Sequence, residues 1–378
     1  MRWPHRLCVS TSTPLEILMN RCILTLALAT LALSPIATSQ EAETAESAPT
    51  YEGLWETSYG RMRLSQTGAK VSGEYSYSAL STIDGEVEGD RLTFKYSEGE
   101  TGGEGWYELA EDGESFEGKW REDGAERWSR WKGTRVRPLK GIVWLVILEA
   151  HWETSIAEEE YAFGDMLRSY FTMESARHVR IRYRTFHDES DLRRWSREVK
   201  FLAEPVALLI SSHGTPKGVS VGQDVIDAEA LADCVRGSHN LEVLHLSGCS
   251  MMKSDVPATI QRLLGPDQKL PITGYTTAVA WDASALADFV YLSMLLIHRM
   301  SPIDAVAQTH ILAPFTREDR LPGARFQALG LRSLSADGKS SATEPLDEPR
   351  VGRRQRPGSG RPARERQRPG RDTEGSER

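Results

Sequence analysis

The chain has 378 residues, of which 39% are hydrophobic and 26% charged, and its formal net charge is −8. The length leaves room for two folded domains, and the composition excludes a fully disordered chain. The acidic balance argues against nucleic acid as the main partner, because binding phosphates requires a clustered basic excess.

The N-terminus has the features of an export signal. Residues 22–37 form an uncharged apolar run that follows Arg21, and small residues stand at 37–39. This order is typical of a secretory signal, and the run is too short to span a membrane comfortably. We predict that residues 1–39 are this signal, with an upstream extension if Met19 is the true start. The mature protein is then periplasmic or extracellular without a stable membrane span; an uncleaved anchor is the alternative.

Residues 51–137 are predicted to form an all-β domain. Short segments in which polar and apolar residues alternate are separated by turn-forming glycine and aspartate. This pattern is typical of an antiparallel meander, and about eight strands suit a small closed barrel. The pairs Gly73 with Tyr75 and Gly118 with Trp120 resemble those of small lipocalin-like and avidin-like barrels. We expect the aromatic residues to fill the interior as a core; a small apolar ligand is the alternative.

From residue 140 the pattern changes to apolar strands that alternate with helices. Strands are predicted at 142–148, 179–186, 206–212, 241–247 and 271–275, and helices at 155–170, 188–201, 228–235, 256–264, 283–300 and 302–311. The first strand is continuously apolar, as buried parallel strands are, whereas the second alternates and should lie nearer an edge. We predict an α/β domain over residues 140–330 with a mostly parallel sheet covered on both faces.

The last segment, residues 335–378, is rich in arginine, proline, glycine and serine and repeats Arg-Gln-Arg-Pro-Gly. It cannot bury enough apolar surface to offset the loss of chain entropy on folding. We predict a disordered, solvated basic tail; a tether to an anionic surface is the alternative.

Two predicted strands end in residues with catalytic chemistry. The strand at 206–212 leads into His213 and Gly214, and the strand at 241–247 leads into Gly248 and Cys249. In sheets of this kind, functional residues gather beyond the carboxyl ends of central strands. If the two strands are neighbours, the histidine and the cysteine emerge together at one edge of the sheet.

A thiol with its usual pKa of about 8.5 is mostly protonated, so it needs an imidazole that takes its proton or polarises the scissile bond. We predict His213 and Cys249 as this dyad, with the N–H groups of Gly214 and Cys249 as the oxyanion hole. The alternatives are a surface histidine and a small buried cysteine. His245, inside a strand, and Cys234, inside a helix, are expected to be structural.

After signal cleavage only two cysteines, Cys234 and Cys249, would remain. Two are too few for the disulfide framework of small secreted proteins. We expect at least one free thiol, and a disulfide between the two is the alternative.

These motifs in this order resemble one family. The chain shows in turn residues 209–214 (Leu-Ile-Ser-Ser-His-Gly), 243–249 (Val-Leu-His-Leu-Ser-Gly-Cys), 272–282 ending in Trp-Asp, and a helix with Phe289 and Tyr291. Over residues 140–315 the set resembles the caspase-like clan of cysteine peptidases, and its CHAT branch most closely. The chain departs from caspases because Gln-Ala-Cys-x-Gly is absent and the spacing from histidine to cysteine is shorter than about 50 residues.

The resemblance implies an exported caspase-like cysteine peptidase that hydrolyses protein or peptide substrates with His213 and Cys249. The alternative is a catalytically inactive caspase-like scaffold joined to a barrel that binds a partner. No Gly-x-Ser-x-Gly nucleophile elbow is expected after a strand, which argues against a serine hydrolase of the α/β-hydrolase fold. No ligand cluster has a familiar metal-binding spacing, so we expect neither a metal nor another cofactor.

Substrate preference is predicted from residues near the cysteine. Side chains two apart on a strand share a side, so Ser247 should stand beside the pocket for the residue that precedes the cut. Asp255 and Asp282 favour a basic substrate side chain if either reaches the pocket floor. The alternative for both is an exposed aspartate at the start of a helix. We expect a preference for basic over acidic side chains.

Overall fold

The computed structural model describes residues 50–77, 81–151, 155, 157, 162–175, 178–319 and 327–337. The predicted export signal lies outside these residues, as does the predicted basic tail beyond Asp337. None of the described helices is long and apolar enough to cross a membrane.

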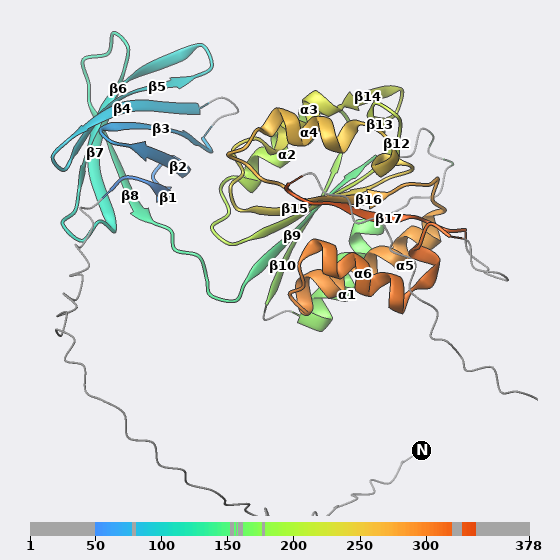
Figure 1. The fold of residues 1–378 in the computed structure, drawn as a ribbon. Helices are drawn as coiled ribbons and strands as arrows, with labels where there is room; N and C mark the ends of the chain where they lie inside the picture. Colours follow the sequence, from blue (N-terminus) through green and yellow to red (C-terminus); the bar gives the residue numbers. More distant parts are fainter. Residues whose placement is uncertain are drawn as a thin grey trace, which may run out of the picture. The chain divides into compact units, whose positions relative to one another are not determined.

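The first domain is a closed barrel of eight antiparallel strands that follow one another in chain order (Figure 1). Its strands are β1 (Gly53–Thr57), β2 (Gly60–Thr67), β3 (Lys70–Tyr75), β4 (Ser81–Glu88), β5 (Arg91–Glu98), β6 (Thr101–Leu109), β7 (Ser115–Glu122) and β8 (Ser129–Arg135). Each strand pairs with the next, and β1 also pairs with β8, which closes the barrel. The predicted eight-stranded meander is confirmed.

Aromatic side chains pack in the interior of this barrel. In β5, Leu92, Phe94 and Tyr96 are buried and the residues between them are exposed, the alternation of a strand with one face on a core. Trp131 lies among these rings, and its centroid is 5.2 Å from that of Tyr75. Such contacts are those expected when aromatic residues fill the core. A small apolar ligand in the barrel remains the alternative.

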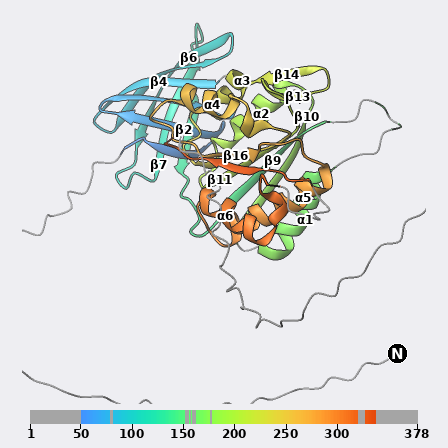
Figure 2. The same ribbon diagram turned by 45° about the vertical axis from the view of Figure 1, so that its right-hand side comes forward.

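The second domain is built on a six-stranded sheet with the order β10-β9-β11-β15-β16-β17 (Figures 1 and 2). Its strands are β9 (Val143–Ala150), β10 (Val179–Phe186), β11 (Val206–Ser211), β15 (Leu241–Ser247), β16 (Ile272–Tyr275) and β17 (Leu331–Leu334). The first five strands in this order are parallel, as predicted, and β17 is antiparallel to β16. The sequence did not predict β17, which lies just beyond the expected boundary at residue 330.

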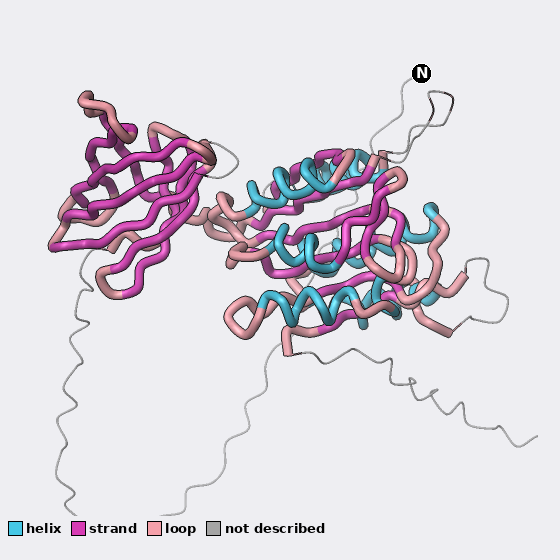
Figure 3. The backbone as a smooth tube through the Cα atoms, turned by 90° about the horizontal axis from the view of Figure 1, so that it is seen from above, coloured by secondary structure: helices cyan, strands magenta, loops and turns pink. Residues whose placement is uncertain are grey.

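In the described part of the chain, six α-helices cover the sheet on both faces (Figure 1), and Figure 3 looks down on one of these faces. They are α1 (Phe163–Ser175), α2 (Glu189–Val199), α3 (Ala228–Val235), α4 (Val256–Leu264), α5 (Trp281–Leu292) and α6 (Pro302–Leu312). Apolar residues of α2, α3 and α4 form one core with the sheet, and those of α1, α5 and α6 form another. All eight residues of β9 are buried, because this strand is covered on both sides.

Two helices have an end that lies more than two residues from its predicted position. The first helix begins at Phe163 rather than near residue 155, and it ends at Ser175. The helix predicted at 283–300 is α5 followed by a π-helical turn, η2 (Ser293–Ile297). The hydroxyl of Ser293 donates a hydrogen bond to the carbonyl oxygen of Phe289, a back-bond that bends helices.

A small three-stranded antiparallel sheet follows β11 directly. It consists of β12 (His213–Gly214), β13 (Gly218–Val221) and β14 (Asp224–Asp227). Val219, Val221 and Ile226 are buried in the same core as α3 and α4. This packing fixes the segment that carries His213.

Candidate active site

The register of two neighbouring strands brings His213 and Cys249 to one edge of the sheet. β11 and β15 pair in parallel, and their last partners are Ser211 and Ser247. Each candidate residue follows its strand by two positions. Because parallel strands end at the same edge, the two residues emerge on neighbouring strands.

Gly214 lies directly against the backbone of Cys249. A Cβ atom placed on Gly214 would be 2.0 Å from the carbonyl oxygen of Cys249 and 2.8 Å from its nitrogen. Only glycine fits at such a distance from backbone atoms. The segment with the predicted oxyanion-hole glycine and the segment with the predicted nucleophile are therefore in contact.

The thiol of Cys249 is half-buried and interacts with the backbone of Val279. The N–H of Val279 donates to the sulfur at 3.4 Å, and the thiol lies 3.8 Å from the carbonyl oxygen of the same residue. These two contacts hold the sulfur against the segment that immediately precedes α5.

The residue after the cysteine adopts an uncommon backbone conformation. Ser250 has φ 56°, in the left-handed region that residues other than glycine seldom occupy. Its N–H donates to the carbonyl oxygen of Thr277 at 2.8 Å, which holds the turn in place. Strained backbone of this kind clusters at functional sites.

His213 is exposed, but the surrounding protein partly removes its imidazole from water. This desolvation lowers the pKa of His213 below its usual value of 6.5. The ring is therefore mostly neutral at neutral pH, the form that accepts a proton.

The three predicted pocket residues occupy different environments. Ser247 is 8% exposed, and its hydroxyl donates to the carboxylate of Asp288 at 2.6 Å. Asp255 is exposed at the start of α4, and Asp282 is exposed in the first turn of α5, where it accepts a hydrogen bond from its neighbour's N–H. Both aspartates thus lie at helix starts, and the preference for basic substrates stays a prediction.

Asp288 is a buried carboxylate close to the candidate site. Its side chain has no exposed surface, and it accepts hydrogen bonds from His245 Nε2 at 2.8 Å, from Ser247 and from the hydroxyl of Tyr275. A buried carboxylate is stable only when donors satisfy it, and three do so here. These contacts tie α5 to β15 and β16, just before the turn that carries Cys249.

Sequence reasoning missed Asp288 because a lone aspartate in a helix normally faces solvent. The spacing of residues in the helix could have indicated that Asp288 is buried. The aspartate is spaced at i, i+4 and i+7 with Ser284 and Tyr291, so it falls on a buried face of α5. His245 was expected to be structural, and it is 1% exposed with Nδ1 2.8 Å from the hydroxyl of Thr273.

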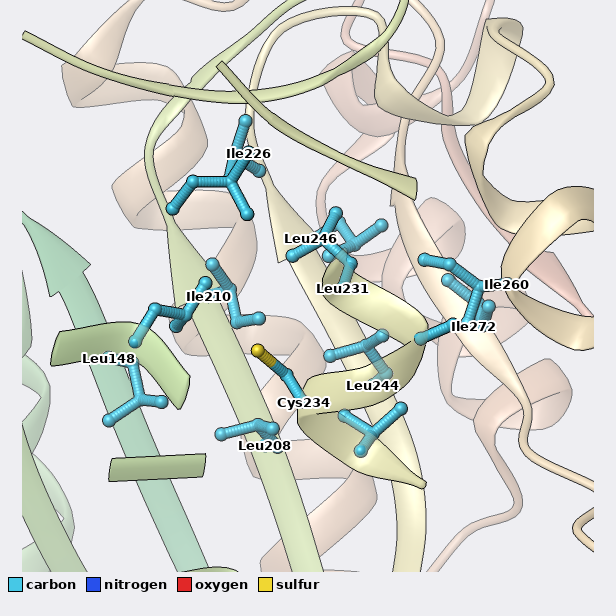
Figure 4. Packing of buried hydrophobic residues seen from close by; sticks show 14 of the residues in the cluster. Leu148, Leu208, Ile210, Ile226, Leu231, Cys234, Leu244, Leu246, Ile260 and Ile272 are labelled. Carbon is cyan, nitrogen blue, oxygen red and sulfur yellow. The ribbon is translucent and has the colours of Figure 1, made fainter. Parts of the chain in front are cut away.

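Cys234 belongs to the core and not to the site. It is buried in α3 beside Leu208, Leu231 and Leu244 (Figure 4). Burial raises the pKa of its thiol to about 11, so little thiolate forms at neutral pH. Both described cysteines are free thiols, so the alternative of a disulfide between them is not observed.

Residues 218–222, Gly-Val-Ser-Val-Gly, contain the residue pattern Gly-x-Ser-x-Gly. A nucleophile elbow is a sharp turn between a strand and a helix. Here Ser220 lies inside the antiparallel strand β13, and its hydroxyl donates to the carbonyl oxygen of Asp224 at 3.3 Å. The match has no elbow geometry.

Comparison with known proteins gave no relative: no protein-family model matches the chain, and no curated protein sequence matches it significantly.

Proposed function

We propose that the α/β domain is a caspase-like cysteine peptidase that uses His213 and Cys249. The observation that carries this proposal is the parallel pairing of β11 and β15, which brings both residues to the same edge. The close packing of Gly214 on the backbone of Cys249 supports it further. The order of motifs in the sequence, which resembles CHAT peptidases, suggests the reaction class.

The reaction needs only groups that this edge supplies, together with water. His213 accepts the thiol proton of Cys249, and the thiolate attacks the carbonyl carbon of the scissile peptide bond. The N–H groups of Gly214 and Cys249 hold the oxyanion that forms. The C–N bond then breaks, and His213 returns the proton to the leaving amine. Water hydrolyses the thioester, which releases the acid and restores the thiol.

Export belongs to the same proposal. The apolar run at residues 22–37 suggests that the mature protein works in the periplasm or outside the cell. Its substrates would then be proteins or peptides in that compartment.

A thiol-directed acyloxymethyl ketone probe tests the proposed nucleophile. We expect the probe to label the full chain, and Cys249→Ala to abolish labelling. Cys234→Ala is the matched control, because that thiol is buried and its raised pKa disfavours the thiolate, so labelling should persist. Equal labelling of the parent and Cys249→Ala proteins would contradict the proposal and favour an inactive scaffold.

A further inference from the structure

The edge strand β10 presents a row of arginines on one face. Within the described residues this strand pairs only with β9, so its other side is an edge of the sheet. Arg180, Arg182 and Arg184 alternate with Ile181 and Tyr183, and all three arginines are exposed. Side chains two apart share a face, so the three guanidinium groups lie on the same side of the sheet.

Tryptophan rings support these arginines. Two guanidinium groups lie over the ring of Trp144, that of Arg180 at 5.6 Å and that of Arg182 at 4.8 Å from the ring centroid. Two others lie over the ring of Trp195, that of Arg184 at 5.1 Å and that of Arg194 at 4.8 Å. Stacking on an aromatic ring restricts a guanidinium group but leaves its N–H edge free to bind an anion. We call these four arginines the arginine face.

The charge of this face is not neutralised locally. Among the described residues, no carboxylate lies within ion-pair distance of any of the four guanidinium groups, although Arg180 interacts electrostatically with Glu204 and Arg194 with Glu198 at longer range. The neighbouring Arg193, by contrast, contacts both Glu189 and Asp233. Concentrated positive charge is notable in a chain whose formal net charge is −8.

The arginines also protect the strand edge. Arg182 donates to the carbonyl oxygen of Ile181 at 3.1 Å, and Arg184 donates to that of Tyr183 at 2.8 Å. Charged side chains on an edge strand hinder its pairing with other strands. An incoming segment would therefore contact the guanidinium groups rather than extend the sheet.

We propose that the arginine face docks an extended acidic segment of a partner polypeptide. Alternate residues of a strand are about 6.6 Å apart, which matches the spacing of alternate carboxylates in an extended peptide. Each guanidinium offers two parallel N–H groups to a carboxylate. The overall negative charge of the chain disfavours a long polyanion such as nucleic acid, whereas a short acidic segment interacts mainly with this face.

The arginine face leads toward the candidate active site. His187 directly follows β10 and His151 directly follows β9, and the two imidazole centroids are 4.9 Å apart. The next strands in the sheet, β11 and β15, end at the proposed dyad. An acidic segment bound to β10 would therefore place the rest of its chain along the carboxyl ends of these strands. Docking itself does not depend on whether the dyad is active.

Fluorescence anisotropy tests the docking with the full chain carrying Cys249→Ala, so that a bound peptide is not cut. The probe is a fluorescein-labelled peptide as long as β10 that alternates glutamate with serine, and the reference peptide has glutamine for glutamate. We expect only the glutamate peptide to bind and Arg182→Gln/Arg184→Gln to weaken it about tenfold or more. Arg91→Gln is the matched control, because Arg91 also lies over a tryptophan, 4.3 Å from Trp106, but contacts Glu108.

Three results would overturn the proposal: equal affinity for the two peptides, unchanged affinity after the double substitution, or tighter binding of an oligothymidine than of the glutamate peptide. Self-association of the double variant without peptide binding by the parent would mean that the arginines only protect the edge. If the double variant does not fold by circular dichroism, Arg180→Gln/Arg194→Gln serves instead, and the parent's affinity must fall steeply with salt.

Discussion

Gly214 is the residue at which the candidate site has least room. A methyl group there would meet the carbonyl oxygen of Cys249 at 2.0 Å, and backbone atoms cannot move away as a flexible side chain does. We expect Gly214→Ala to reduce probe labelling by about 100-fold, the size of effect seen when an oxyanion-hole donor is lost. Gly222→Ala is the control, since Gly222 lies in the turn between β13 and β14 with open space around it, and only its φ of 58° is strained. Its labelling should remain.

The lowered pKa of His213 predicts the pH at which activity is lost on the acidic side of the pH profile. The imidazole must be neutral to accept the thiol proton, so activity is lost as the pH falls through the pKa of the folded protein. Because desolvation lowers this pKa, the midpoint should lie below 6.5. A pH profile of the labelling rate measures it. A midpoint above 6.5, or the same acid limb in His213→Ala, would contradict the assignment.

Asp288 should matter for stability far more than Asp282, although both belong to α5. An asparagine has one acceptor oxygen where the aspartate has two, so Asp288→Asn leaves buried donors without a partner, which typically costs about 1–3 kcal/mol for each donor. We expect Asp288→Asn to lower the free energy of unfolding by at least this amount, measured by urea denaturation. Asp282→Asn, at an exposed position, should leave the midpoint unchanged. Similar midpoints for the two variants would show that the hydrogen bonds to Asp288 contribute little.

At the scale of the elements, the helix caps give a matched comparison. Asp227 begins α3 and accepts hydrogen bonds from the N–H groups of Glu229 and Ala230. Asp255 begins α4, but its side chain makes no capping hydrogen bond. We expect Asp227→Ala to cost about 1 kcal/mol in urea denaturation and Asp255→Ala clearly less. An equal loss would mean that charge at the helix start, not the hydrogen bond, stabilises these helices.

Elements with a strong local signal were predicted from sequence to the residue. Strand β10, strand β15 and helix α3 have the predicted bounds. β10 alternates along its length, whereas β15 is a short, mostly apolar run between the turn-forming residues Asn240 and Gly248. β17 was missed because its four residues, Leu331–Leu334, have apolar side chains only at the two ends and therefore show neither an apolar run nor a period. The end of the fifth helix was misplaced because apolar residues continue through the π-helical turn at Ser293–Ile297.

The candidate site was predictable only in part, for a related reason. His213 and Cys249 follow strands with clear patterns, so their placement at strand ends could be read from the sequence. Their proximity depends on the pairing of β11 with β15, a long-range contact that no local pattern encodes. The same holds for Asp288, whose partners His245 and Ser247 are more than forty residues away in the chain, 43 and 41 respectively.

At the scale of the whole molecule, the change of pattern near residue 138 corresponds to a change of fold class. The buried apolar residues of the barrel form one cluster of their own, from Tyr51 to Trp131. The α/β domain has two further clusters, one on each face of its sheet. A domain with its own core can fold independently, so the barrel is expected to fold without the rest of the chain.

A fragment of residues 48–138 tests this independence. Pairing of β1 with β8 closes the barrel within the fragment, so no strand is left with an open edge. We expect a β-type far-ultraviolet spectrum and one cooperative thermal transition. Trp131→Ala should abolish or strongly lower that transition, because a buried tryptophan in contact with several rings typically contributes about 3–5 kcal/mol. Trp128→Ala is the matched control, since Trp128 is exposed. A helical or disordered spectrum would show that the barrel needs the α/β domain to fold, and equal effects of the two substitutions would show that the buried Trp131 stabilises the barrel no more than an exposed residue does.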